Sequence, residues 1–195
     1  MPMRSGAMRS GRTRALWRLH LAGALLVLPL SQARGNPPEA RMQINSSSFS
    51  HQGSIPAKYT CEGSDTSPPL AWSGLPASAK SLALIVDDPD APDPKAPKMT
   101  WVHWVLYDIP PDSAALAEGV KILPAGTKAG LNGWKRASYG GPCPPIGRHR
   151  YFHKLYALDT VLKDIGRAGE VEVEAAMRNH ILAQATLIGT YEKGH

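Results

Sequence analysis

Proline and glycine interrupt this chain at short intervals, and that punctuation constrains the fold more than any other feature. The 195 residues include 18 prolines and 18 glycines. Between them lie short apolar runs rich in β-branched and aromatic residues, which are typical of strands. Mostly β structure with few helices predicts an antiparallel β-sandwich and not an alternating α/β sheet. The predicted strands are residues 43–49, 81–86, 101–109, 149–159 and 185–192.

One helix is predicted, late in the chain, over the segment EVEVEAAMRNHILAQ (170–184). Its apolar and aromatic positions recur at the spacing of a single helical face. The predicted face consists of Val173, Ala176, Met177, His180 and Ile181.

The first 33 residues have the composition of a secretory signal peptide. Five arginines precede the apolar run Leu21–Leu30, and Ser31–Ala33 supplies small residues for cleavage. The run has ten residues, whereas a membrane-spanning helix needs about 20. We therefore expect an exported bacterial protein, periplasmic or secreted, with a disordered lead over 34–41, a single domain over 42–195 and no transmembrane segment in the mature chain. An uncleaved anchor is the alternative, and Met3 or Met8 are alternative starts.

Without the predicted signal peptide, the net charge of the chain is much smaller. The whole chain has 22 basic and 16 acidic residues, but residues 1–33 hold five arginines and no acid. The remainder therefore has 17 basic residues against 16 acidic ones, a net charge of +1, and shows no Lys/Arg-rich stripe. Nucleic-acid binding is not predicted.

The predicted export bears on the redox state of the two cysteines, Cys61 and Cys143. Both stand beside glycine or proline in loop-like sequence. In an oxidising compartment a disulfide between them is the simplest interpretation. Two free thiols with unrelated packing roles remain the alternative.

Residues two apart in a strand share a face, and this parity predicts a polar–aromatic site. In 101–109, it puts Trp101, His103, Val105 and Tyr107 on one side. In 149–159, it puts His149, Tyr151 and His153 on one side, with Arg150 and Phe152 opposite. If the two strands are neighbours, Trp101, His103, His149 and Tyr151 converge at their starting ends.

The segment DDPDAPDPKAP (87–97) follows a predicted buried strand. Its acid spacing is only faintly similar to a calcium loop, whose glycine and terminal glutamate it lacks. Asp93 is interpreted as part of a solvated turn. Asp88 and Asp90 are candidate functional or structural residues because they stand where the strand emerges, between prolines that restrict the backbone.

The stretch YGGPCPPIGRHRY (139–151) allows three interpretations: a nucleophile's turn, a metal clip or a stiff wall around a ligand. A Cys143–His149 nucleophile pair would need a free thiolate, which a disulfide at Cys143 removes. One cysteine with scattered histidines is weak support for a zinc site. A serine nucleophile is not indicated either, because the sequence has no G-x-S-x-G motif. Gly140 and Gly141 permit close approach, whereas Pro144 and Pro145 restrict the backbone. We therefore favour a stiff wall that borders a metal-free anion site, although lone histidines are often satisfied core residues.

Four motifs in register resemble the phosphatidylethanolamine-binding protein family, in its bacterial Raf-kinase-inhibitor-like branch. They are IPAKYTCEGSDTSPPLAW (55–72), DDPDAP, WVHW and YGGPCPPIGRHRY, and the resemblance spans roughly 42–191. It implies an antiparallel β-sandwich with a small anion pocket at one end. The chain departs from the eukaryotic pattern at Cys143 and in a shorter stretch before His149, so eukaryotic partners are not carried over. The pocket residues implied are Asp88, Pro92, Trp101, His103, Pro144, His149 and Tyr151.

Two functions follow from this resemblance and from the residues. The first is an exported binding protein for a small anion, such as phosphate or a phospholipid headgroup, with inhibition of a kinase or protease through the same surface as a variant. The second is a hydrolase that uses His103, His149 and Asp88 as acid and base groups. No cofactor or metal is expected, and the family has no common catalytic activity. Arg150, on the opposite face, is predicted to pair with Asp90 in a structural role.

Overall fold

The computed structural model describes residues 41–163, 165–166 and 168–194, and all of them belong to one compact unit. The predicted signal peptide (1–33) and all but the last residue of the predicted lead (34–41) lie outside the described residues. The elements, in chain order, are β1 (Gln43–Asn45), a 3-10 turn (Ala57–Tyr59), β2 (Leu70–Ser73), β3 (Ser81–Asp88), β4 (Trp101–Ile109), β5 (Ala115–Leu116), β6 (Lys128–Ala129), β7 (Arg148–Leu158), α1 (Glu170–Met177) and β8 (Ile181–Glu192).

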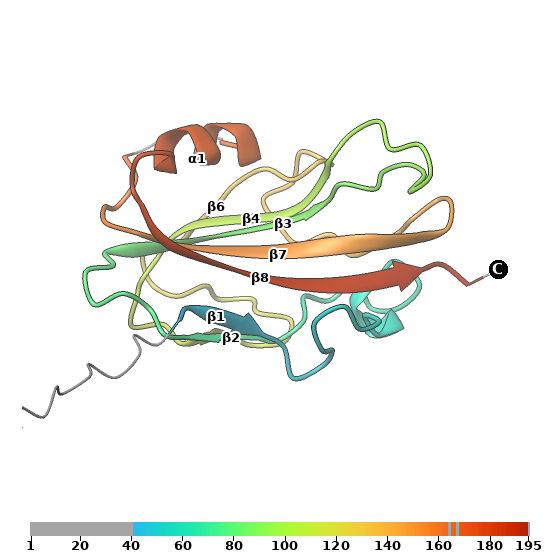
Figure 1. Cartoon of the computed structure of the whole chain (residues 1–195), viewed down its shortest axis with the longest axis horizontal. Coiled ribbons are helices and arrows are strands. Elements are labelled where there is room, and N and C mark those ends of the chain that lie inside the picture. Colours follow the sequence, from blue (N-terminus) through green and yellow to red (C-terminus); the bar gives the residue numbers. More distant parts are fainter. Residues whose placement is uncertain (1–40, 164, 167, 195) are drawn as a thin grey trace, which may run out of the picture. The chain divides into compact units, whose positions relative to one another are not determined.

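The strands form two antiparallel sheets, which confirms the predicted fold class. The smaller sheet has the order β1-β2-β5, and the larger has the order β6-β4-β3-β7-β8. Figure 1 shows β1 and β2 on one face of the large sheet and α1 on the other. Apolar side chains fill both spaces between these layers. Among the described residues, no helix has the length and apolar character needed to cross a bilayer.

β3 is the central strand of the large sheet, and it is buried at all eight positions. Its side chains alternate between the two cores: Leu82, Leu84 and Val86 face the small sheet, whereas Ala83 and Ile85 face α1. This alternation continues to the end of the strand, where two aspartates follow. Asp87 and Asp88 therefore begin on opposite faces of the same sheet.

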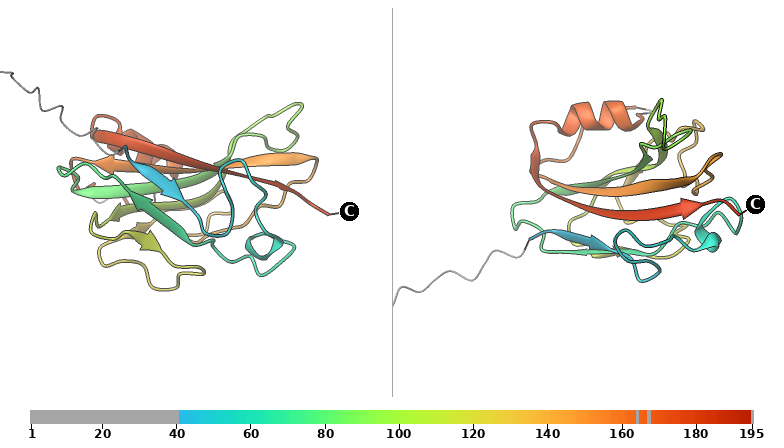
Figure 2. Two further views of the ribbon diagram at one scale, coloured as in Figure 1. Left: turned by 60° about the horizontal axis from the view of Figure 1, so that its bottom comes forward. Right: turned by 45° about the vertical axis from the view of Figure 1, so that its right-hand side comes forward.

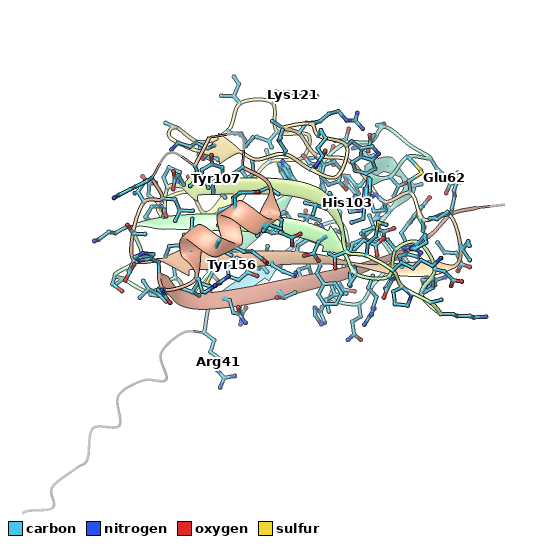
Figure 3. All side chains as sticks on the ribbon, turned by 90° about the horizontal axis from the view of Figure 1, so that it is seen from above. Arg41, Glu62, His103, Tyr107, Lys121 and Tyr156 are labelled. Atoms are coloured by element: carbon cyan, nitrogen blue, oxygen red, sulfur yellow. A yellow bond between two sulfur atoms is a disulfide. The ribbon has the colours of Figure 1, made fainter. Side chains whose placement is uncertain are left out.

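Parity in β4 is interrupted by a bulge, so one prediction is wrong. Val86 pairs with Trp104 and Asp87 with Val102, which leaves His103 as the extra residue. A bulge turns the following side chains to the other face. Val105 and Tyr107 consequently pack beneath α1, and do not share a face with His103. Figure 3, viewed onto α1, shows Tyr107 beside the helix and His103 further toward the end of the sheet where Glu62 lies.

The predicted helix is present but shorter than expected. α1 ends at Met177, and Ile181 already belongs to β8, where it pairs with Leu158 of β7. Val173 and Met177 are buried as the helical spacing predicted, whereas His180 and Ile181 lie beyond the helix. Hydrogen bonding along the whole length of β7 outweighs the local helical preference of residues 181–184. His180 closes the turn, since its Nδ1 is 2.8 Å from Oδ1 of Asp159.

Candidate functional site

The two aromatic strands are not neighbours, because β3 lies between them. Both run antiparallel to β3, so their first residues lie at the same end of the sheet, where β3 finishes. The convergence predicted for adjacent strands is therefore achieved across β3, which adds Asp88 to the group. Figure 2 shows the loops that extend from this end, including the green β3–β4 connection and the orange loop before β7.

A cavity of about 510 Å³ opens at this end of the sandwich. It is bounded by the β3–β4 loop, by the loop between β6 and β7, and by the segment around Cys61. Tyr151, by contrast, is not on its surface. The predicted residues that line the cavity are Asp88, Pro92, Trp101, His103, Pro144 and His149.

His149 is held from both sides. Its side chain is fully buried, with Nδ1 2.7 Å from Oδ2 of Asp88 and Nε2 3.0 Å from the carbonyl oxygen of Ile146. The second Asp88 oxygen accepts the backbone N–H of Asp90 at 2.8 Å. A carboxylate and a carbonyl both accept hydrogen bonds, so each ring nitrogen of His149 faces an acceptor. The pair therefore fixes the ring and leaves no ring nitrogen free.

His103 has a different environment. Its Nδ1 is 2.6 Å from the carbonyl oxygen of Gly140, which makes Nδ1 the donor and leaves Nε2 as an acceptor in the neutral ring. Burial lowers the pKa of His103, although the Gly140 carbonyl and the Asp88 charge oppose this effect. The free protein therefore presents a neutral imidazole at the cavity wall.

Tyr151 supports the site from beneath. Its ring meets His103 edge-on at 5.1 Å, and its hydroxyl has no hydrogen-bond partner among the described residues. Burial, with the Asp88 charge as the next cause, raises the pKa of Tyr151. The phenol is therefore neutral, and it packs behind the histidine without reaching the cavity surface.

Arg150 points away from the cavity and binds Asp90 through two side-chain contacts, Nε to Oδ2 at 2.9 Å and NH2 to Oδ1 at 2.6 Å. The Arg150 backbone N–H adds a third bond to Oδ2 at 2.9 Å. These bonds with Arg150 hold the pKa of Asp90 below its usual value. The β3–β4 loop is thereby fastened to the start of β7.

The loop before β7 is fastened to the segment 59–65. Cys61 and Cys143 form a disulfide with their Cα atoms 5.4 Å apart. Cys61 N–H donates to the Pro142 carbonyl at 3.1 Å, and Gly141 N–H donates to Asp65 Oδ1 at 2.6 Å. A side chain at Gly141 would meet the Tyr59 carbonyl oxygen at 2.4 Å, so only glycine fits there. The stretch 139–147 is a stiff wall of the cavity.

Sequence reasoning missed five lining residues: Asp65, Ala91, Met99, Trp134 and Arg136. Trp134 and Arg136 share one loop. Their loop is organised by buried Asn132, whose Oδ1 accepts the backbone N–H groups of both at 3.0 and 3.1 Å. Trp134 packs edge-on against Trp101 and His103, each at 5.3 Å, and the Arg136 guanidinium stacks over Trp134. The segment NGWKR (132–136) carried a signal, an Asn-Gly turn followed by an aromatic and two basic residues.

Comparison with known proteins identifies the family. The family model described as phosphatidylethanolamine-binding protein matches residues 45–192. A protein of Methanothermobacter thermautotrophicus named UPF0098 protein is 49% identical over 156 residues, which cover 78% of this chain and all of that protein. The chain belongs to the phosphatidylethanolamine-binding protein family.

Two solved structures are similar in both sequence and fold. The homologue CT736 from Chlamydia trachomatis is 44% identical with a TM-score of 0.74, covering 80% of this chain and 99% of that chain. Escherichia coli YbcL, described as a member of the mammalian family, is 31% identical with a TM-score of 0.72, covering 80% of this chain and all of that chain. The two-sheet arrangement is thus shared with experimentally solved relatives.

Proposed function

We propose that this chain is an exported binding protein whose cavity takes a small phosphorylated ligand, a free phosphate group or a phospholipid headgroup. The supporting observation is a guanidinium group in the cavity wall, that of Arg136. Asp88 is engaged by His149 and by the Asp90 N–H, and Asp65 accepts the Gly141 N–H. The Arg136 guanidinium lines the cavity and has no ion pair among the described residues. An unpaired arginine suits a phosphate, which it binds through two parallel hydrogen bonds.

The cavity walls support the same proposal. The disulfide, Asp65 and the Arg150–Asp90 pair hold the loops before a ligand arrives, so little conformational entropy is lost on binding. Trp101 and Trp134 supply apolar walls beside the polar groups, the usual composition of a small-molecule site. Export is supported by the composition of residues 1–33 and by the disulfide.

The hydrolase alternative has less support. Both nitrogens of His149 are engaged, so this ring has no free position for proton transfer. Among the described lining residues there is no hydroxyl, lysine or free thiol that could act as a nucleophile. Inhibition of a kinase or protease is supported by no described residue other than those that support ligand binding.

Calorimetric titration tests the proposal, with inorganic phosphate and phosphoethanolamine as ligands and ethanolamine, which lacks the phosphate group, as the control ligand. Loss of a charged hydrogen-bond partner is expected to weaken phosphate binding about tenfold or more in Arg136→Gln. Arg178→Gln, an exposed arginine beyond α1, is the matched control and should bind as the wild type does. Equal affinities in the two variants would contradict the proposal.

Turnover assays separate binding from hydrolysis. Phosphoesters and peptides would be offered to the wild type, to His149→Ala and to His103→Ala. Binding without turnover is expected. Reproducible hydrolysis that disappears in either variant would replace the binding function with the enzymatic one.

A further inference from the structure

The side chains around the cavity mouth have a composition different from the cavity itself. Three of the eight large hydrophobic side chains exposed among the described residues gather there: Met99, Trp134 and Ile146, with 52%, 37% and 55% of their surface accessible. Met99 and Trp134 line the mouth, and Ile146 follows the lining residue Pro145. Single exposed apolar residues are ordinary, but three large ones around one opening indicate an interaction surface.

The loops that carry these residues lie side by side. Gly147 is adjacent to Pro94, since a Cβ atom at Gly147 would lie 3.3 Å from Pro94 Cγ. The tip of the β3–β4 loop and the loop before β7 therefore meet at the same end of the molecule, and both extend beyond the sheet in Figures 1 and 2. Trp134 joins them from the third loop by its contact with Trp101.

Exposed cations lie in the same loops as Met99 and Trp134. Lys95 and Lys98 belong to the β3–β4 loop, and Lys135 and Arg136 follow Trp134; none of these four forms an ion pair with a described residue. The acids nearby are mostly engaged. Asp90 and Glu192 are paired with arginines. Asp93, Asp65 and Glu172, whose charge interacts with Lys135, accept only backbone N–H groups and keep their charge. The four unpaired cations outnumber these three carboxylates, so the net charge of this surface is positive.

We infer that this cavity rim (Lys95, Lys98, Met99, Trp134, Lys135, Arg136 and Ile146) docks on an anionic lipid bilayer. Trp, Met and Ile side chains suit the boundary between headgroups and acyl chains, and flanking Lys and Arg meet the lipid phosphates. Charge complementarity selects the anionic surface, and the protruding apolar side chains favour a bilayer over an acidic protein. The inference goes beyond the ligand proposed for the cavity, because the rim can bind a membrane whether or not the cavity is filled.

Co-sedimentation with vesicles tests the rim. Vesicles of phosphatidylcholine and phosphatidylglycerol should bind the wild-type chain, vesicles of phosphatidylcholine alone should bind it weakly, and added salt should release it. Lys95→Glu/Lys98→Glu should bind the anionic vesicles roughly 30-fold more weakly. The matched control is Lys80→Glu/Lys163→Glu, two exposed lysines at the opposite end of the sheet, which should bind as the wild type does.

A second pair of variants tests the apolar part. Ile146→Glu should weaken binding about tenfold or more, whereas Val161→Glu should not, although the two side chains are similarly exposed at 55% and 57%. Equal losses in rim and control variants, or equal binding to both kinds of vesicle, would overturn the inference. Binding to soluble polyglutamate as strong as to anionic vesicles would also overturn it and assign the rim to an acidic protein.

The two proposals fail separately. Lys95 and Lys98 do not line the cavity, so their double variant should keep the wild-type affinity for inorganic phosphate while it loses vesicles. If the wild type binds vesicles but no phosphate, membrane docking by the rim is supported and the proposed cavity ligand is contradicted. If it binds phosphate but no vesicles, the proposed cavity ligand is supported and membrane docking by the rim is contradicted.

Discussion

Asp87 and Asp88 are consecutive residues of β3 with opposite roles on the two faces of one sheet. Asp88 faces the cavity end, where it holds fully buried His149. Asp87 faces α1, where it pairs with Lys154, whose side chain is 28% exposed. Beside Asp87, burial and then the Asp87 carboxyl itself raise the pKa of Glu170 to about 8. The α1 face thus collects charges that affect stability, whereas the other face orients groups toward the cavity.

Burial of the partner decides how much each aspartate contributes to stability. Both carboxylates are nearly inaccessible to solvent, at 1% and 4% exposure. The Lys154 ammonium still reaches water if its partner is removed, but the His149 ring does not. A polar group that loses its partner is costly where water cannot replace that partner.

The largest expected effect comes from breaking the two pairs separately. Asp88→Ala should lower the free energy of unfolding by about 3 to 5 kcal/mol, because it leaves both the His149 Nδ1 and the Asp90 N–H buried without a partner, at about 1 to 3 kcal/mol for each. Asp87→Ala should cost about 1 kcal/mol or less, since Lys154 turns to solvent. Denaturant unfolding of the two variants measures both values. Equal losses would remove the contrast between the faces.

A second effect concerns the stability of the fold at low pH. Burial lowers the pKa of His153 from 6.5 to about 4, so below pH 6.5 the unfolded chain takes up a proton that the folded chain does not. Stability is fully present above this range and should fall by up to about 3 kcal/mol as the pH falls toward 4. His153 packs near Phe49, and His153→Phe should lose less stability in acid. An unchanged acid slope in this variant would exclude His153 as the source.

On the α1 face, the pH dependence of stability should have the opposite sign. The effect should be smaller than that of His153 because Glu170 is only partly buried. Its raised pKa means that the folded chain keeps a proton which the unfolded chain loses above pH 4.5. This contribution is present below pH 4.5 and is lost as the pH rises toward 8. Glu170→Gln should therefore be more stable than the wild type in mild base, by thermal unfolding. Asp112→Asn, an exposed carboxylate, is the control and should follow the wild type.

The smallest expected effect is on ligand affinity. His103 is neutral in the free protein because burial lowers its pKa, and an oxyanion favours its protonated form. Affinity should therefore rise as the pH falls below 6.5, by at most about tenfold per pH unit. Inorganic sulfate is the suitable probe because its charge stays constant in this range. The dependence should disappear in His103→Gln; if it persists there, another group binds the proton.

Much of the fold followed from local sequence pattern. Turn residues and β-favouring runs predicted the strands, and four motifs identified the family. The sequence did not reveal the bulge at His103, which is fixed by pairing with β3, nor the strand that replaces 181–184 of the predicted helix. Trp134 and Arg136 were missed because their loop has no periodicity, and its shape depends on bonds to Asn132. Tyr151 shares the predicted face but lies one layer beneath the cavity, a depth that parity does not encode.

Mapping of backbone amide shifts by nuclear magnetic resonance, during titration with inorganic phosphate, tests the central claim most directly. We expect saturable shifts at Arg136, Gly140 and Gly141 around the cavity, with none along α1 from Glu170 to Met177. No saturable shift at the cavity, or shifts centred on α1, would contradict the assignment of ligand binding to the Asp88 side of the sheet.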